Sequence, residues 1–371
     1  MKEPFPHAMM PLASHDERAR EQITASFKIH MEDSVYPANG DVFERRTRPA
    51  FARQNKRDPQ TRQDVRKAMS SEPFYQMWSA IARTLQEQLW DNVGECVERQ
   101  LPELIERARV GNRKVGSLML NPGMEIPRYN AAIDIHCMPG GYHTEYGSDD
   151  VYQGALYDRG AFMYGRGLRG PMHDGYAQEI KLYLEKACPP GFKPKKILDM
   201  GCAIGSSTGA IARMFPDAEI HGIDIGAGML RYAHARAEAM KTPIHFSQQN
   251  AEGTDFEDES FDLVFSCILM HETSSRALPN YIRETKRLLK PGGIALHLDF
   301  PHNEGKTPFA QAFGDWSTHY NAEPFIGTLG DTDVTEVALS AGFTSNTAAV
   351  VPMAQYIPGN YMHMLDLRKP A

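Results

Sequence analysis

The stretch that decides the fold is Asp199-Met-Gly-Cys-Ala-Ile-Gly-Ser-Ser207, in the second half of a chain of 371 residues. The run Lys196-Ile-Leu198 precedes it, and residues 208–213 have the composition of a helix. Strand, glycine-rich turn and helix in this order typically form a ligand site at the carboxyl edge of a parallel sheet. The sequence therefore predicts an α/β fold with a nucleotide-type site at this turn.

The glycines of the turn let the backbone bend sharply and approach a ligand without an intervening Cβ. Dinucleotide sites use the pattern G-x-G-x-x-G. Here the glycines are Gly201, Gly205 and Gly209, and Ala203 stands where the second glycine of that pattern would fall. Ser206 and the free amides at the start of the helix can hold a carboxylate. The spacing therefore favours a ligand other than a dinucleotide.

A second signal lies in residues 218–224, a predicted strand that ends in an acid, Asp224. An acid at the end of the second strand can accept hydrogen bonds from both hydroxyls of a ribose. Hydrogen bonds to a charged group contribute roughly 1.5–3 kcal/mol each. We therefore expect Asp224 to anchor the ribose of the ligand.

With these motifs the chain resembles the class I S-adenosylmethionine-dependent methyltransferases, of the UbiE-like small-molecule type, over residues 170–371. The first motif of that family matches residues 199–205, with Ala203 in place of the usual glycine. The extra methyl group is small, so we expect cofactor binding to be retained. The fourth strand matches residues 261–267, and the motif before the fifth strand matches Arg287-Leu-Leu-Lys-Pro-Gly-Gly293.

The resemblance implies a Rossmann-like fold, with a seven-stranded, mostly parallel sheet and helices on both faces. It implies S-adenosylmethionine as the cofactor, with the adenine edge at Asn250-Ala-Glu252, where the commoner aspartate is absent. The residues that it assigns to the cofactor are Asp199, Gly201, Ala203, Gly205, Ser206, Asp224, Ile225, Met229, Asn250, Ala251, Glu252 and Cys267. A doubly wound sheet that binds another nucleotide, or none, is the alternative.

Composition narrows the possible functions. The formal net charge of −7 argues against a general nucleic-acid binder, whose binding surface would be basic. We expect no membrane span, because no run of 18 apolar residues occurs, and the first residues lack a secretory apolar core. The five cysteines show neither a C-x-x-C pair nor zinc spacing, which indicates reduced thiols in a cytoplasmic protein.

We expect a mainly helical N-terminal domain at 1–117, a connector or lid at 118–170, and a cofactor-binding domain at 171–371 with a substrate-shaping insertion at about 300–330. Long ordered loops inside a domain are usually functional. The other expected elements are helices at 16–31, 73–110, 176–186 and 331–341, and two strands at 343–351 and 361–367 that are joined by a Pro-Gly turn.

Within 73–110 we expect Pro102 to start a new helix or to kink the first one. Apolar side chains recur there at three- and four-residue steps, which is typical of a core or a dimer interface and favours a homodimer. They are Trp78, Ile81, Leu85, Leu89, Val93 and Val97.

Residues 118–170 are rich in glycine, tyrosine, aspartate and histidine. This composition is too polar for a simple helix pair and too aromatic for a disordered linker. We interpret the segment as an ordered lid over the cofactor. In similar methyltransferases the segment before the first motif contacts the methionine part of the cofactor and the substrate, which makes Tyr157, Tyr164 and Arg166 candidates.

Methyl transfer from a sulfonium is an in-line displacement, so much of the rate can come from positioning. The predicted base is His271, which follows the fourth strand, because an imidazole can accept a proton near neutral pH. Glu272 could orient that ring or bind an amine; the alternative is that both residues are structural. His297 is a weaker candidate. Possible walls of the substrate pocket are His302, Trp316, His319 and Tyr320.

His136, Cys137 and His143 could form a metal cluster with Asp134 nearby. They lie in a glycine-rich loop without strong ligand spacing, so an ordered polar loop is the favoured interpretation and no metal is predicted.

The function that we predict is methyl transfer from S-adenosylmethionine to an oxygen, nitrogen or carbon of a small metabolite, in specialised biosynthesis. One alternative is an RNA or protein methyltransferase that holds a polyanion on the basic stretch 45–67, although a solvated linker explains that stretch more simply. The other is a cofactor-binding protein without turnover.

Overall fold

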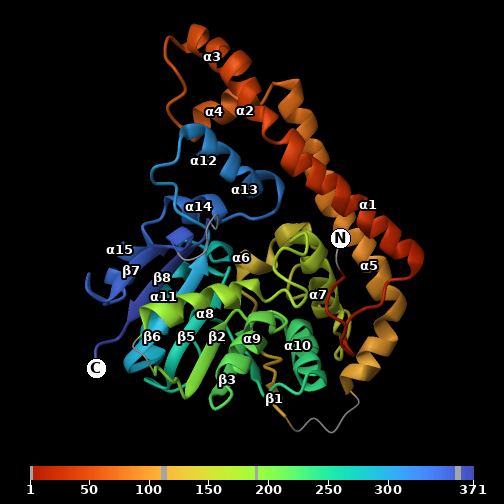
Figure 1. Ribbon diagram of the computed structural model, residues 1–371, viewed down its shortest axis with the longest axis vertical. Coiled ribbons are helices and arrows are strands. Elements are labelled where there is room, and N and C mark those ends of the chain that lie inside the picture. Colours follow the sequence, from red (N-terminus) through yellow and green to blue (C-terminus); the bar gives the residue numbers. More distant parts are fainter. Residues whose placement is uncertain (1–2, 110–114, 189–190, 356–360) are drawn as a thin grey trace.

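A mostly parallel sheet of eight strands forms the centre of the computed structural model, which describes residues 3–109, 115–188, 191–355 and 361–371 (Figure 1). The order across the sheet is β1-β4-β3-β2-β5-β6-β8-β7. The strands are β1 (Ser117–Met119), β2 (Lys196–Met200), β3 (Glu219–Asp224), β4 (His245–Gln248), β5 (Phe261–Cys267), β6 (Leu289–Asp299), β7 (Ala348–Pro352) and β8 (His363–Arg368).

The sheet has one strand more than the seven predicted. Ser117 to Met119 pair in parallel with β4, from Ser117 opposite His245 to Met119 opposite Ser247. A strand of three residues is too short to show a period in the sequence. The C-terminal hairpin is confirmed, because β8 runs antiparallel to both β6 and β7. Its predicted Pro-Gly turn falls in 356–360, outside the described residues.

Helices cover both faces of the sheet, as predicted. Side chains of successive residues on β2 point to opposite faces. Ile197 is buried against α8 (Gly175–Ala187), α9 (Ser206–Met214) and α10 (Ala227–Ala239). Leu198 is buried on the other face, with α11 (Ala277–Leu288) and α15 (Val334–Ser340). Within the described residues, none of the helices has both the length and the apolar character needed to cross a bilayer.

The N-terminal part is helical, as predicted. Two long helices, α1 and α5, run side by side along one edge of the molecule, and the shorter ones lie at its far end (Figure 1). These helices are α1 (His15–His30), α2 (Ala38–Val42), α3 (Arg48–Asn55), α4 (Arg62–Met69) and α5 (Pro73–Arg109), with π-helical turns at Met31–Val35 and Phe43–Thr47.

Helix α5 corrects the expectation at Pro102, which lies inside one continuous helix and starts no new one. Proline removes a helical hydrogen bond, and that cost is offset here by packing beyond it. Leu104 is fully buried and Ala108 is buried in the same cluster as Leu89. Val110, the predicted end of the helix, lies outside the described residues.

The apolar stripe of α5 is covered within the chain. Leu89, Val93 and Val97 are buried in a cluster with the helix α7 (Tyr152–Tyr164), whereas Trp78 packs against Phe313 of the insertion. The stripe therefore belongs to the core of one molecule, and it no longer supports a homodimer.

The predicted lid contains α7, a buried helix that its composition did not suggest. Its glycines serve close packing rather than a loop. A Cβ at Gly154 would lie 2.2 Å from Cβ of Tyr232, and one at Gly160 would lie 2.2 Å from Cζ3 of Trp90. The segment also holds α6 (Arg128–Ala131) and a short 3-10 helix at Ile135–Cys137.

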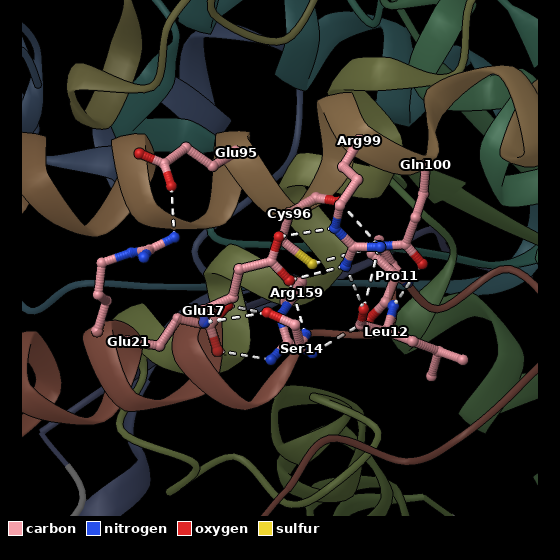
Figure 2. A network of polar contacts seen from close by, with 11 residues as sticks. Pro11, Leu12, Ser14, Glu17, Glu21, Glu95, Cys96, Arg99, Gln100 and Arg159 are labelled. Carbon is pink, nitrogen blue, oxygen red and sulfur yellow. Dashed lines mark hydrogen bonds and ion pairs between the residues drawn. The ribbon is translucent and has the colours of Figure 1, made fainter.

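A polar network fixes α7 to the N-terminal helices (Figure 2). Arg159 of α7 is buried and donates two hydrogen bonds to Glu21 of α1, at 2.7 and 2.5 Å, and a third to the carbonyl of Pro11. Arg99 of α5 binds Glu17 of α1 in the same way, at 2.8 and 2.7 Å. These fork-shaped contacts hold the three helices in one arrangement.

The insertion contains α12 (Pro308–Gly314), α13 (Trp316–Tyr320) and α14 (Ile326–Asp331), and it faces the basic stretch. Arg62 binds Asp331 at 2.6 Å, and Arg66 binds Asp315, which is itself buried. Further ion pairs within the N-terminal part involve Arg46, Arg48 and Arg57. Much of the positive charge at 45–67 is therefore paired inside the chain.

Candidate active site

A cavity of about 500 Å³ lies where strands β2, β3, β5 and β6 end. Its lining includes Asp199 of β2, Asp224 of β3, Cys267 of β5 and Phe300, the residue after β6. Carboxyl ends of parallel strands are the usual ligand site of open α/β sheets. The cavity therefore lies at the edge of the sheet where the sequence predicts the cofactor.

The glycine-rich turn lies against this cavity. Gly201 has a φ of +76° and Gly205 a φ of +73°, a backbone region that glycine enters without steric cost. A Cβ at Gly201 would lie 2.8 Å from Cδ1 of Leu269, so the space beside it is small. Ala203 also has a positive φ, +46°, where a side chain costs roughly 1–2 kcal/mol.

Asp224 is held by the turn. Its Oδ2 accepts the Ala203 N–H at 2.9 Å, and its Oδ1 accepts the Gly226 N–H at 3.0 Å. Burial raises the pKa of this carboxyl group above its usual value. Each carboxylate oxygen can accept two hydrogen bonds, so the carboxylate keeps capacity for a hydroxyl of a ribose.

Two further polar groups fit a bound cofactor. Ser206 Oγ is buried at the start of α9, lines the cavity, and has no hydrogen-bond partner among the described residues. Such a group is expected to have a partner, which a ligand can supply. Asp199 is also buried and accepts a hydrogen bond from Thr208 Oγ1 at 2.5 Å, and burial raises its pKa to about 7.

The aromatic side of the cavity comes from α7 and the turn after it. Tyr157, Tyr164 and Arg166, which the sequence proposes as cofactor or substrate contacts, all line the cavity. Arg166 is held by Glu32 at 2.9 Å and Asp33 at 3.0 Å. The segment predicted as a lid therefore supplies one wall of the cavity.

Not all the proposed cofactor residues line this cavity. Those outside its lining are Gly205, Ile225, Met229, Asn250, Ala251 and Glu252. Met229 is fully buried in the core. Asn250 borders a separate hollow beside β4, whereas Glu252 accepts hydrogen bonds from Tyr129 and Asn280. Their contacts with the cofactor remain predictions.

His271 and Glu272 lie in a 3-10 helix, Met270–Glu272, directly after β5, and both line the cavity. Nδ1 of His271 lies 2.7 Å from Oδ1 of Asp299, whereas its Nε2 is buried and has no hydrogen-bond partner in the part of the chain that the structure describes. Burial favours the neutral imidazole, but the charge of Asp299 outweighs it and raises the pKa of His271. The role of His271 as a base remains a prediction.

The other proposed residues lie elsewhere. His297 is buried beside Tyr281 and Ser266, outside the lining of the cavity. The proposed substrate walls His302, Trp316, His319 and Tyr320 do not line the cavity either. Trp316 instead borders a neighbouring hollow that Tyr164 also lines.

Sequence reasoning missed the partners of His271 and Glu272. Nε2 of His136 lies 3.3 Å from Oε1 of Glu272, and its Nδ1 lies 3.1 Å from Oε1 of Glu323. Burial favours the neutral ring, but Glu323 and Glu272 together raise the pKa of His136 to about 10. Tyr142 donates a hydrogen bond to Oε1 of Glu272 at 2.8 Å.

The sequence holds no signal for the contact between His136 and Glu272, because these two residues lie far apart in the chain. Cys137, which the sequence places beside His136 in a possible metal cluster, contacts Asn321 instead, with Sγ 3.8 Å from Oδ1.

Residues 197–293 match the family model of a methyltransferase domain. The match covers the glycine-rich turn, Asp224 and strands β2 to β5. Together with the order of the motifs and the mostly parallel sheet, it defines a methyltransferase domain of the α/β type. This part of the chain is a domain of the class I S-adenosylmethionine-dependent methyltransferases.

The chain is similar to a malonyl-[acyl-carrier protein] O-methyltransferase of Halorhodospira halophila, with 27% identity over 43% of this chain and 52% of that protein. It is 30% identical to phosphoethanolamine N-methyltransferase 1 of Arabidopsis thaliana, over 40% of this chain and 28% of that protein. The chain thus spans about half, or less, of the length of these relatives.

Among solved structures, phosphoethanolamine N-methyltransferase 2 of Haemonchus contortus, in complex with S-adenosyl-L-methionine, matches with a TM-score of 0.39 and 20% identity, over 53% of each chain.

Proposed function

We propose that the protein transfers the methyl group of S-adenosylmethionine to a small molecule bound in the same cavity. One observation carries this proposal. A single cavity is lined both by Gly201 and Asp224, which fit a cofactor, and by His271 and Glu272, which can contact an acceptor. Reacting groups held in one enclosed space gain rate from proximity and orientation.

In this reaction the acceptor atom forms a bond to the methyl carbon while the bond from carbon to sulfur breaks. Sulfur keeps the electron pair, and S-adenosylhomocysteine leaves. A hydroxyl or ammonium acceptor must also lose a proton. The lining of the cavity includes the titratable side chains of His271, Glu272 and His136, and also the aromatic rings of Tyr157 and Phe300.

A small acceptor fits these observations better than a polymer. The basic stretch 45–67, which carries the alternative of an RNA or protein substrate, is largely engaged in ion pairs within the chain. The named activities of the relatives, on malonyl-[acyl-carrier protein] and on phosphoethanolamine, include an oxygen and a nitrogen acceptor.

The free thiols of all five cysteines support a cytoplasmic location.

The test is a transfer assay with methyl-labelled S-adenosylmethionine and fractions of a metabolite extract. We expect a labelled small product and release of S-adenosylhomocysteine. Asp224→Ala should reduce both by at least about tenfold at low cofactor concentration, because it removes the proposed ribose anchor. Wild-type protein that binds the cofactor, yet yields neither product with any fraction, would favour the alternative of a cofactor-binding protein without turnover.

A further inference from the structure

Three side chains that line the cavity bring their donor atoms into one group. One atom each of His136, His271 and Glu272 lies within 4.8 Å of the other two. Oε1 of Glu272 lies 3.3 Å from Nε2 of His136 and 4.0 Å from Nε2 of His271. We propose that these three residues bind a divalent transition-metal ion, and that the ion holds the acceptor of the methyl group.

The spacing of the donor atoms is close to that of a metal site. Donors bonded to zinc at about 2.0–2.1 Å in a tetrahedron lie roughly 3.3 Å from one another. The contact between His136 and Glu272 already has this length, at 3.3 Å. The contact between His271 and Glu272, at 4.0 Å, must close by several tenths of an ångström.

The second ring nitrogen, Nδ1, of each histidine also has a carboxylate beside it. A histidine that binds a metal through one ring nitrogen almost always donates the other N–H to a carboxylate, a carbonyl or water. Nδ1 of His271 has such a partner, Oδ1 of Asp299 at 2.7 Å, whereas Nδ1 of His136 forms an ion pair with Glu323 at 3.1 Å without the geometry of a hydrogen bond. The hydrogen bond of His271 therefore directs its Nε2 toward the shared centre, and Nε2 of His136 lies there because it contacts Oε1 of Glu272 at 3.3 Å.

Glu272 is oriented as well. Its Oε1 accepts a hydrogen bond from Tyr142 at 2.8 Å. Hydrogen bonds to a ligating carboxylate are a regular part of metal sites. All three proposed ligands thus have a second contact that fixes their direction.

Burial gives an independent reason for a ligand here. His271 is 1% exposed, and its Nε2 has no hydrogen-bond partner among the described residues although it lines the cavity. A buried polar atom left unpaired costs roughly 1–3 kcal/mol. A metal ion bound to Nε2 would remove that cost. It would also offset the charges of Glu272, Glu323 and Asp299, which surround the two rings.

The backbone at His136 also has an uncommon conformation, which hydrogen bonds from α5 hold in place. His136 has a φ of +58°, a conformation that side chains rarely adopt. Its carbonyl accepts hydrogen bonds from Trp90 Nε1 at 2.8 Å and Gln86 Nε2 at 2.9 Å, both on α5. The long helix thereby holds the imidazole in the cavity, which gives the N-terminal part a direct role in the site.

The ligand set selects the ion. Imidazole with one carboxylate suits zinc, iron, manganese, cobalt or nickel, whereas magnesium and calcium prefer oxygen ligands alone. Three protein ligands leave coordination positions open, as in catalytic metal sites. Because the three proposed ligands line the cavity, an acceptor there with a carboxylate, or with a hydroxyl beside a carbonyl, could bind the ion through oxygen. This assignment of the acceptor rests on the proposed methyl transfer, whereas the metal site itself does not.

The experiment uses the full-length protein, stripped with a chelator and titrated with Co²⁺, whose visible absorption reports its coordination. We expect about one cobalt ion per chain, bound through nitrogen and oxygen. His136→Gln and Glu272→Gln should each weaken binding by about tenfold or more. The matched control is His221→Gln, because His221 also pairs with a glutamate, Glu219, but lies on β3 away from the cavity.

Circular dichroism and thermal unfolding of each variant show whether the fold is retained. The proposal is overturned if the stripped wild type takes up no cobalt, or if His221→Gln weakens binding as much as the two ligand variants. Failure of the methyl-transfer proposal looks different: cobalt binds as expected, but no extract fraction is methylated. If methyl transfer proceeds unchanged in excess chelator, the proposal that a metal ion holds the acceptor is overturned. The methyl-transfer proposal is then unaffected.

Discussion

The imidazole of His271 and the carboxylate of Asp299 form a buried pair, with Nδ1 2.7 Å from Oδ1, at the ends of two adjacent strands. This contact directs Nε2 into the cavity. Asp299→Asn keeps the shape of the side chain but removes its charge. We expect methyl transfer to slow by about 10–100-fold, as is typical when an outer carboxylate partner is lost. Calorimetry should show unchanged affinity for S-adenosylhomocysteine; an equal loss of that affinity would contradict the assigned role.

Two substitutions in the turn at 199–205 are expected to change the free energy of unfolding in opposite directions. Ala203→Gly removes a side chain from a backbone at φ +46°, and the flexibility of glycine in the unfolded chain offsets part of the gain. We expect a change in the free energy of unfolding between about 0 and 1 kcal/mol in the stabilising direction.

Gly205→Ala should destabilise by about 1–3 kcal/mol, because its φ is +73° and the new Cβ would lie 3.0 Å from Cζ of Phe246. Urea unfolding measures both variants. Stabilisation by Gly205→Ala would show that the turn has a different conformation.

Close packing of α7 predicts a third effect. Gly160→Ala would place a Cβ 2.2 Å from the ring of Trp90, so the helix must shift. We expect a loss of about 1–3 kcal/mol in stability, and weaker cofactor binding because Tyr157 and Tyr164 move with the helix. Gly147→Ala is the control, since a Cβ there meets nothing within 4 Å. Equal stability of the two variants in thermal unfolding would be evidence against this packing.

His297 predicts how stability depends on pH. Burial lowers its pKa to about 3, whereas an exposed histidine titrates near pH 6.5. Below about pH 6.5 the unfolded chain binds a proton at His297 that the folded chain does not bind. The free energy of unfolding is therefore unaffected by His297 above that pH and decreases as the pH falls below it. Between about pH 7.5 and 5.5 this one group should cost about 1 kcal/mol.

Urea unfolding of the wild type and His297→Gln at these two pH values checks that effect. The variant should lose less stability on acidification than the wild type does, by the amount that His297 contributes. The same loss in both proteins would mean that other groups cause the dependence.

The parts of the site that lie close together in the sequence could be predicted from it. The turn at 199–205 follows one strand and Asp224 ends the next, and adjacent parallel strands bring their carboxyl ends together. His271 lies in the short 3-10 helix that comes soon after the end of β5, and it could be predicted for the same reason.

The contacts of His136 could not be predicted. Its position depends on hydrogen bonds from α5, and its partners Glu272 and Glu323 come from a distant loop and from the insertion. Local patterns carry no information about such contacts. The glycines of α7 suggested a loop, whereas they allow this helix to pack closely against Tyr232 and Trp90. Glycine is typical of both situations, so the residue type alone does not distinguish them.

The central claim is that the cavity binds S-adenosylmethionine with its ribose at Asp224. The most direct measurement is calorimetric binding of S-adenosylhomocysteine to the wild type, to Asp224→Ala and to Asp217→Ala, an exposed aspartate of the same domain. We predict micromolar binding that Asp224→Ala weakens by at least tenfold, which is about 1.4 kcal/mol, and that Asp217→Ala leaves unchanged. The account would be contradicted by a wild type that does not bind, or by equal affinity of all three proteins.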